Sequence, residues 1–272
     1  PEGKVIRVVK RKRKQYVGII QSGQNMSFFV PDDRKIHIDF LVPRENLNKA
    51  KHGEKVIVEI TDWPSHSKNP FARVITVLGQ PGSNEVEINS ILANYEFPLG
   101  FPKKVENEAL KISLEIGAEE IKKRKDFRNT FTFTCDPSDA KDFDDAISIK
   151  KLNNGNYEIG VHIADVSYYV KEGSEIDKEA FERATSIYLV DRVIPMLPEV
   201  LSNNVCSLRP NEDKLCFSVV FEMNSEAKVI NYWIGHTIIN SNRRFNYDEV
   251  QEIIETGKGE YSQEILTLHR LS

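Results

Sequence analysis

The sequence is poor in cysteine and has no long apolar run. It contains only three cysteines, Cys135, Cys206 and Cys216, and none of them stands in a CxxC pair. This spacing argues against a zinc site and against a disulfide framework. No apolar stretch approaches the roughly 20 residues that a membrane-spanning helix needs, and the opening segment has no signal-peptide pattern. These absences favour a protein with no membrane partner in a reducing, cytoplasmic setting.

The sequence also lacks the short motifs of several large enzyme classes. It has no GxSxG nucleophile elbow, no GxGxxG dinucleotide motif and no P-loop. Apolar residues make up 40% of the chain and charged residues 29%, as in an ordinary globular protein. The length of 272 residues favours two domains over one.

Net positive charge is confined to the start of the chain. Residues 1–80 contain 15 Lys and Arg against 8 Asp and Glu, a net charge of +7. The remaining residues contain 22 against 33, a net charge of −11. This separation suggests a basic module that binds a polyanion next to an acidic module that binds metal. A merely uneven surface charge is the alternative.

The first 80 residues have the pattern of short strands. Apolar alternation bounded by turn residues predicts strands at 4–11, 15–22, 26–33, 35–43, 54–60 and 71–79. Five or six strands in this length predict a small closed β barrel. The rings of Tyr16, Phe28 and Phe29, close to the basic residues Lys12 and Arg13, predict a platform for single-stranded nucleic acid. The alternative is that these rings belong to the barrel core.

The rest of the chain alternates between helical and strand patterns. Residues 81–127 predict a helical connector, with helices at 83–96 and 103–116. Beyond it, strands are predicted at 130–134, 145–151, 157–170, 214–224 and 229–240, and helices at 174–190, 246–257 and 262–272. The predicted fold class is a β barrel followed by an α+β domain.

Five aspartates fall within ten residues, at Asp136, Asp139, Asp142, Asp144 and Asp145. The strand-like flanks predict that the loop folds the first aspartate back towards the last three. Two unit charges about 4 Å apart repel by about 4 kcal/mol at an effective dielectric of about 20. Either the pKa values of these carboxyls rise or a cation binds between them. An all-oxygen ligand set favours Mg²⁺ or Mn²⁺ over zinc.

The spacing of the acidic cluster does not fit a calcium loop of the EF-hand type, because Ile147 would stand where that loop requires glycine. A solvated acidic surface stays open as the alternative. Phosphoryl transfer is the leading use of a carboxylate Mg²⁺ site, where two ions activate water and stabilise the leaving oxygen. Together with the basic barrel, the pattern predicts a metal-dependent nuclease.

Three long motifs resemble a known family. The stretches DPSDAKDFDDAISI, VHIADVSYYV and IPMLPEVLSNNVCSLRPNE, after the basic barrel, resemble the bacterial ribonuclease R and ribonuclease II family of exoribonucleases. The resemblance implies a cold-shock (OB) RNA-binding domain at 1–80, the helical connector at 81–127 and the N-terminal part of an RNB catalytic domain at 128–272. It also implies further domains before and after this chain, which is therefore expected to be a fragment.

The resemblance implies an activity. The family hydrolyses RNA processively from the 3′ end, releasing 5′-nucleoside monophosphates with Mg²⁺, and the expected partner is single-stranded or structured RNA. By resemblance, Asp136, Asp142 and Asp145 hold metal. Asp144 completes the metal and catalytic set, as the carboxylate whose loss stops chemistry but spares RNA binding, and Asp139 lies outside it. The alternatives are a non-catalytic RNA-binding module of the same family and a metal-stabilised structural protein.

The resemblance also suggests roles outside the acidic cluster. Tyr188 corresponds to an aromatic that clamps terminal bases, whereas the residue alone would indicate an ordinary ring on a helix. Arg209 is expected to contact phosphate or to form a structural ion pair. His162 is expected to pack within its strand and Asp165 to orient the neighbouring loop. A monomer is expected, and association with the RNA-decay or translation machinery is left open.

Overall fold

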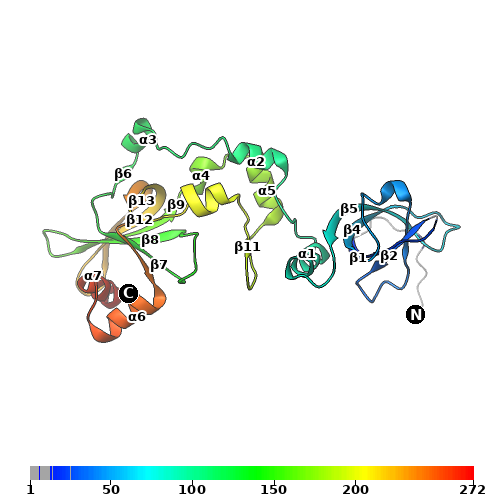
Figure 1. Cartoon of the computed structure of the whole chain (residues 1–272). Coiled ribbons are helices and arrows are strands. Elements are labelled where there is room, and N and C mark those ends of the chain that lie inside the picture. The colour runs from blue at the N-terminus through cyan, green and yellow to red at the C-terminus, as the bar shows by residue number, and fades with distance from the viewer. Residues whose placement is uncertain (1–5, 7–12, 14, 25) are drawn as a thin grey trace. The chain divides into compact units, whose positions relative to one another are not determined.

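The chain forms two compact units, Pro1–Gly100 and Phe101–Ser272. The computed structural model describes residues 6, 13, 15–24 and 26–272. The first unit is built around a small barrel and the second around a large sheet (Figure 1). Across these described residues, no helix is both long and apolar enough to cross a membrane.

The barrel of the first unit is closed by five strands. They are β1 (Gln15–Gln21), β2 (Ser27–Pro31), β3 (Phe40–Val42), β4 (Lys55–Asp62) and β5 (Phe71–Gly79), in the order β1-β2-β3-β5-β4. A 3₁₀ helix, Arg44–Asn46, follows β3, and helix α1 (Asn84–Asn94) follows β5. Phe29 and Phe40 are the largest rings of the barrel core. The predicted closed barrel is confirmed.

Two predicted strands of this unit have a different outcome. The strand predicted at 4–11 lies outside the described residues, apart from Ile6. The strand predicted at 35–43 is reduced to Phe40–Val42. A turn at Asp33 explains the difference, because its carbonyl accepts a hydrogen bond from Ile36 N at 2.9 Å and its side chain accepts one from Lys35 N at 3.0 Å.

The second unit contains a seven-stranded mixed sheet in the order β14-β7-β8-β9-β12-β13-β6. Its strands are β6 (Lys125–Asp126), β7 (Thr132–Asp136), β8 (Asp145–Lys151), β9 (Tyr157–Ala164), β12 (Asp213–Met223), β13 (Val229–Asn240) and β14 (Arg243–Asn246). β14 runs parallel to β7 and β6 parallel to β13, whereas the other neighbours are antiparallel. The predicted α+β domain is confirmed.

Helices complete the second unit. They are α2 (Lys103–Ala109), α3 (Ala118–Lys122), α4 (Val166–Tyr169), α5 (Glu175–Arg183), a π-helical turn at Leu201–Val205, α6 (Tyr247–Thr256) and α7 (Ser262–Leu271). The main core includes Phe127, Phe143 and Leu201, and a second core joins Phe133 and Phe245 to α6 and α7. Phe143 lies in the loop between β7 and β8, so the main core holds the middle of the acidic cluster.

Two predicted helices are too long. The helix predicted at 174–190 ends at Arg183, because Ala184 adopts a left-handed conformation with φ of 63°. The chain then forms a hairpin of β10 (Ile187–Tyr188) and β11 (Val193–Ile194). The helix predicted at 103–116 ends at Ala109 and continues only as single turns.

Candidate active site

The acidic loop, residues 136–145, connects two neighbouring strands of the sheet. Asp136 is the last residue of β7 and Asp145 is the first residue of β8. Between them, the buried ring of Phe143 points into the main core. Its backbone N–H donates to Ser207 Oγ at 3.1 Å, and its carbonyl accepts from Leu208 N at 2.8 Å. The core therefore fixes the position from which Asp142 and Asp144 project.

The carboxyl groups of the acidic loop act on one another. Loss of hydration among packed protein groups raises the pKa of Asp144, and the charges of Asp142, Asp145 and Asp136 raise it further. Burial likewise raises the pKa of Asp136, and the charges of Asp145 and Asp142 add to the shift, whereas the neighbouring Thr134 hydroxyl and the charge of Arg244 oppose it. Asp139 is exposed and is not among the charges that act on either group. The predicted crowding thus involves four aspartates.

The donor set of the acidic loop suits a hard cation. All four interacting groups are carboxylates, the ligand type that Mg²⁺ and Mn²⁺ prefer. Asp136 Oδ2 is buried and has no hydrogen-bond partner within the described residues. In the conformation described, however, no three or more His, Cys, Asp or Glu of these residues stand close enough together to hold a metal ion. The loop therefore supplies carboxylate ligands, and one of their oxygens has no hydrogen-bond donor within the described residues. In this conformation the carboxylates are not yet arranged as a metal site.

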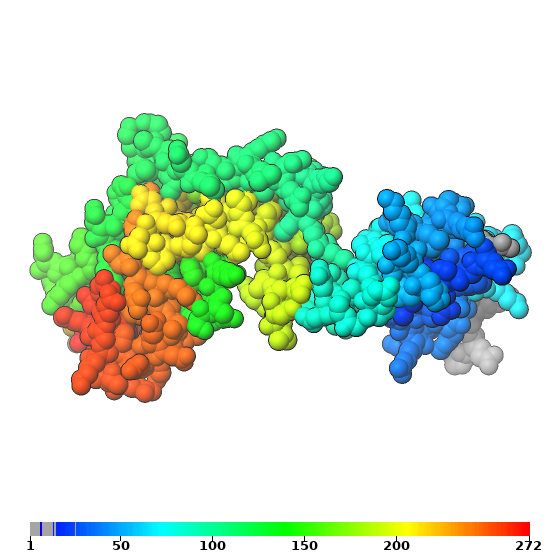
Figure 2. Space-filling model, in the orientation of Figure 1, coloured from blue at the N-terminus to red at the C-terminus, as the bar shows by residue number. Residues whose placement is uncertain are grey.

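Tyr188 lies next to the acidic loop although it is 46 residues away in sequence from Asp142. The β10–β11 hairpin carries it, and its hydroxyl donates to Asp142 Oδ2 at 3.0 Å. Partial burial and then this hydrogen bond raise the pKa of Tyr188, yet the residue as a whole is 66% exposed. In Figure 2 the hairpin forms a yellow-green projection beside the green surface of the loop segment. The ring is therefore open to a ligand on the solvent side.

Two residues that sequence reasoning missed hold the acidic loop. Ser207 Oγ donates to Lys141 O at 2.9 Å, in addition to its contact with Phe143. Arg244 Nη2 donates to both Pro137 O and Ser138 O at 2.7 Å. Ser207 lies in the motif IPMLPEVLSNNVCSLRPNE, but both residues lie more than 60 residues from their partners, so no local spacing links them to the acidic loop. Only the pairing of β14 with β7 places Arg244 here.

Arg209 forms a structural pair. Its Nη2 donates to Asn204 Oδ1 at 2.7 Å and to Glu212 Oε2 at 3.1 Å. This agrees with the ion-pair interpretation of Arg209. Its Nε is buried without a hydrogen-bond partner within the described residues, so a phosphate contact stays a prediction.

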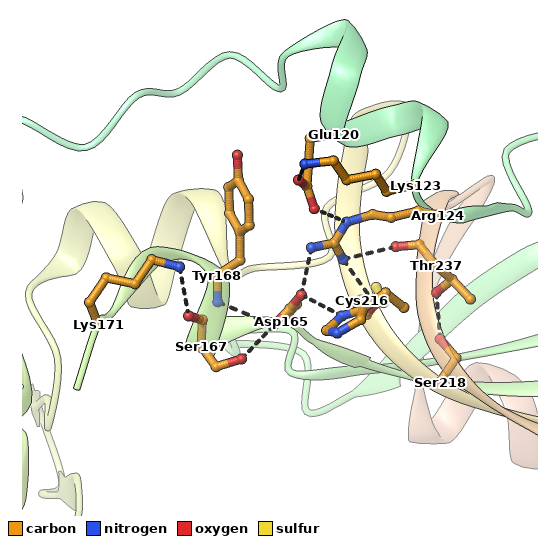
Figure 3. Close-up of polar contacts among 11 residues, drawn as sticks. Glu120, Lys123, Arg124, Asp165, Ser167, Tyr168, Lys171, Cys216, Ser218 and Thr237 are labelled. Carbon is orange, nitrogen blue, oxygen red and sulfur yellow. Dashed lines mark hydrogen bonds and ion pairs between the residues drawn. The ribbon is translucent and has the colours of Figure 1, made fainter.

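Asp165 belongs to a separate buried cluster, the Arg124 cluster, which is shown in Figure 3. Arg124 Nη2 donates to Asp165 Oδ2 at 2.7 Å, and both side chains are 2% exposed. Arg124 Nε donates to Glu120 Oε1 at 2.8 Å, and His236 Nδ1 lies 3.1 Å from Asp165 Oδ2. The other Asp165 oxygen accepts from Tyr168 N and thereby caps α4. Asp165 thus fixes the segment that follows β9.

His162 is packed within its strand, as the sequence interpretation expected. Its side chain is fully buried, with Nδ1 2.7 Å from Ser218 Oγ and Nε2 2.8 Å from Ser148 Oγ. Burial lowers the pKa of His162 to about 4. The imidazole is therefore neutral at physiological pH and has no access to solvent.

The barrel residues predicted to bind nucleic acid differ in exposure. Phe29 is fully buried in the barrel core, so the prediction that its ring stacks on a base is corrected to a core role. Tyr16 packs edge-on against Phe40 at 5.0 Å and is only partly accessible. Phe28 is 40% exposed, and its role in binding RNA stays a prediction. Arg13 pairs with Asp33 at 3.1 Å, and Lys12 lies outside the described residues.

The two units match two domain families. The cold-shock domain model matches residues 28–102, and the RNB domain model matches residues 124–272. The chain therefore belongs to the RNB domain family, with a cold-shock barrel before the RNB domain.

Within that family the chain is similar to ribonuclease R, which confirms the resemblance in the sequence. It is 46% identical to ribonuclease R of Thermotoga maritima over 94% of this chain and 36% of that protein. It is 35% identical to ribonuclease R of Escherichia coli over 93% of this chain and 31% of that protein. The chain thus spans about a third of the length of these curated relatives.

Solved structures share the fold. RNase R of Mycoplasma genitalium in complex with double-stranded RNA matches with a TM-score of 0.85 and 28% identity, covering 98% of this chain and 47% of that chain. Yeast Ssd1, described as a pseudonuclease, matches with a TM-score of 0.73 at 22% identity, covering 97% of this chain and 34% of that chain. Because its identity is low, the second likeness bears on the fold alone.

Proposed function

We propose that the complete protein is an exoribonuclease that hydrolyses RNA from the 3′ end to 5′-nucleoside monophosphates, and that it acts processively. One observation carries the proposal: four aspartates of an RNB domain act on one another without a full set of cationic partners. Two of them, Asp136 and Asp144, have raised pKa values. Such a concentration of carboxylate charge is costly in a folded protein unless a ligand uses it.

The acidic loop would hold a divalent metal. RNB-domain ribonucleases generally depend on such a metal, and we propose Mg²⁺, with Mn²⁺ able to replace it. Asp136, Asp142, Asp144 and Asp145 would supply the ligands, and the bound metal would activate water and stabilise the leaving oxygen. Since the described conformation has no formed cage, metal binding would draw these carboxylates together.

Further residues of the chain would position the RNA. Tyr188 offers an exposed ring whose hydroxyl is held by Asp142, which suits stacking of a terminal base against the site. The side chain of Arg209 is 39% exposed, and its guanidinium would contact a phosphate of the RNA. Phe28 on the barrel would stack on single-stranded RNA. We expect a cytoplasmic monomer.

The experiment that tests the proposal uses the complete protein and RNA labelled at either end. With Mg²⁺, 3′-labelled RNA should release labelled mononucleotide at once, and full-length 5′-labelled RNA should give way to short end products with few intermediates, as processive action requires. Asp144→Asn should lower the rate by about 10³-fold or more, with RNA affinity within about threefold. Asp139→Asn is the matched control and should retain activity, because Asp139 is not among the charges that act on Asp136 and Asp144.

The second candidate is a non-catalytic RNA-binding module. One observation favours it: no metal cage is formed among the described residues. Tight RNA binding by the wild-type protein, with both labelled RNAs intact in Mg²⁺ and in Mn²⁺, would select this candidate.

A further inference from the structure

We propose that Arg244 is a positioning residue that holds the first half of the acidic loop in place. The catalytic part of this inference rests on the proposed function, whereas its structural part does not. The two halves of the loop are held differently. The second half is fixed by the burial of Phe143 and by backbone hydrogen bonds from Leu208 and Ala164, at 2.8 and 2.9 Å.

The first half of the loop depends on one side chain. Pro137 and Ser138 are exposed, and Pro137 has no backbone N–H to donate. Within the described residues, the hydrogen bonds that reach these two from outside the loop both come from Arg244 Nη2, at 2.7 Å each. A charged donor makes a stronger hydrogen bond than a neutral one. Arg244 therefore fixes the backbone next to Asp136.

Arg244 also connects the two halves. The centre of its guanidinium lies 5.1 Å from the centroid of the Phe143 ring, so one side chain contacts the exposed start of the loop and its buried anchor. Its positive charge is the cation that acts on Asp136. The guanidinium can donate to carbonyls and face a ring at the same time, whereas a lysine ammonium is a compact charge without a planar face.

The neighbouring arginine provides a matched control. Arg243 precedes Arg244 on β14, and successive strand residues point to opposite faces. Arg243 pairs with Glu249 at 3.2 Å and with Glu260 at 3.3 Å, and its guanidinium lies 5.0 Å from the ring of Phe245. It has the same charge and strand, but these ion pairs and this ring contact all lie away from the acidic loop.

The first test measures hydrogen exchange in the 272-residue chain without metal or RNA. In Arg244→Met the amide of Ala140, which donates to Pro137 O at 3.1 Å, should exchange about 10-fold faster, as expected when the charged hydrogen bonds that hold Pro137 and Ser138 are lost. Exchange in β8 and β9 should stay as in the wild type, which shows that the domain is folded. Arg243→Met should leave exchange at Ala140 unchanged. Wild-type exchange at Ala140 in Arg244→Met would overturn the proposal.

The second test measures RNA hydrolysis and RNA binding in the complete protein. Arg244→Met should lower kcat about 10-fold or more while the Kd for RNA stays within about threefold, and Arg244→Lys should recover part of the rate because it restores one donor. Unchanged kcat in Arg244→Met, or an equal loss in Arg243→Met, would overturn the positioning role. If the wild-type protein hydrolyses no RNA, the proposed function fails, and the exchange result still decides the structural part.

Discussion

The Arg124 cluster and the acidic loop both contain carboxylates that are partly removed from water. The pKa of the carboxylate is lowered in the Arg124 cluster, whereas two carboxylates of the acidic loop have raised pKa values. In the Arg124 cluster, burial alone would raise the pKa of Asp165. Hydrogen bonds from Arg124 and Ser167 and the charges of Arg124 and His236 outweigh burial, so the pKa of Asp165 is lowered. In the acidic loop, burial and neighbouring carboxylates act together, and the pKa values of Asp136 and Asp144 rise.

This difference separates a structural site from a candidate functional one. A carboxylate whose hydrogen-bond donors and countercharges come from the protein is not stabilised much further by an added cation. A set of carboxylates that lacks them is stabilised when a cation binds. The same reasoning predicts opposite results when one charge is removed from each site.

Breaking the Arg124 cluster should give the largest effect on stability. Arg124→Met leaves Asp165 buried without its guanidinium partner and should cost about 3–5 kcal/mol of unfolding free energy. The protein has two tryptophans, Trp63 in the first unit and Trp233 in the second. In a Trp63→Phe background, Trp233 fluorescence during urea unfolding therefore reports the second unit.

Arg128→Met is the matched control for this prediction. Arg128 also makes two ion pairs, with Asp126 at 2.6 Å and Asp213 at 3.1 Å, but its side chain is 33% exposed. Exposed pairs contribute about 1 kcal/mol or less. If the two variants lost the same stability, burial of the Arg124 pair would not be what distinguishes the cluster.

His162 tests a third case, a buried group with hydrogen-bond partners and no countercharge. Its pKa falls from 6.5 to about 4 in the folded chain. Between these values the unfolded state binds a proton that the folded state excludes, so stability decreases as pH falls from 6.5 towards 4. The loss should reach about 3 kcal/mol.

Urea unfolding followed through Trp233 at pH 7 and pH 4.5 measures this loss. His162→Gln cannot bind the proton, so its stability should change less between the two pH values. His269→Gln should retain the full wild-type pH dependence because His269 is exposed. The idea fails if His162→Gln and the wild type have the same dependence.

Local patterns in the sequence predicted the barrel, five of the seven strands of the large sheet and the crowded aspartates. The short strands β6 and β14 were not predicted, and the strand predicted at 157–170 ends at Ala164 because Asp165 caps α4. Alternation is local, and the capping box of α6 at Asn246 and Glu249 is a four-residue pattern. The end of α5 was missed because Ala184, rather than a glycine, adopts the left-handed conformation. Without that break the periodic pattern runs on to Tyr188.

The partners of the acidic loop could not be predicted in this way. Tyr188 and Arg244 reach the loop through a hairpin and a parallel strand, whose pairing depends on the packed domain. Phe29 was misjudged for a related reason, since alternation shows that one of two adjacent rings is buried but not which one. Phe28 is the exposed ring and Phe29 the buried one.

Removing charge from the acidic loop should give the smallest effect, with the opposite sign. The raised pKa of Asp144 means that the unfolded carboxyl ionises first as pH rises. Ionised Asp144 therefore lowers stability at neutral pH and above its folded pKa. Asp144→Asn should raise the unfolding free energy by a few tenths to about 1 kcal/mol in EDTA, a range reduced for the solvent exposure of this side chain.

In EDTA we expect Asp144→Asn to be more stable than the wild type, and Mg²⁺ should reverse that order. The reversal would sharpen the contrast between the acidic loop and the Arg124 cluster. A ligand that binds only the folded state adds RT ln(1 + [L]/Kd) to stability, so saturating Mg²⁺ should stabilise the wild type more than Asp144→Asn. Asp139→Asn should respond to Mg²⁺ as the wild type does. If Mg²⁺ stabilised the wild type and Asp144→Asn equally, the acidic loop would not be a metal site, and its contrast with the balanced Arg124 cluster would have to be reconsidered.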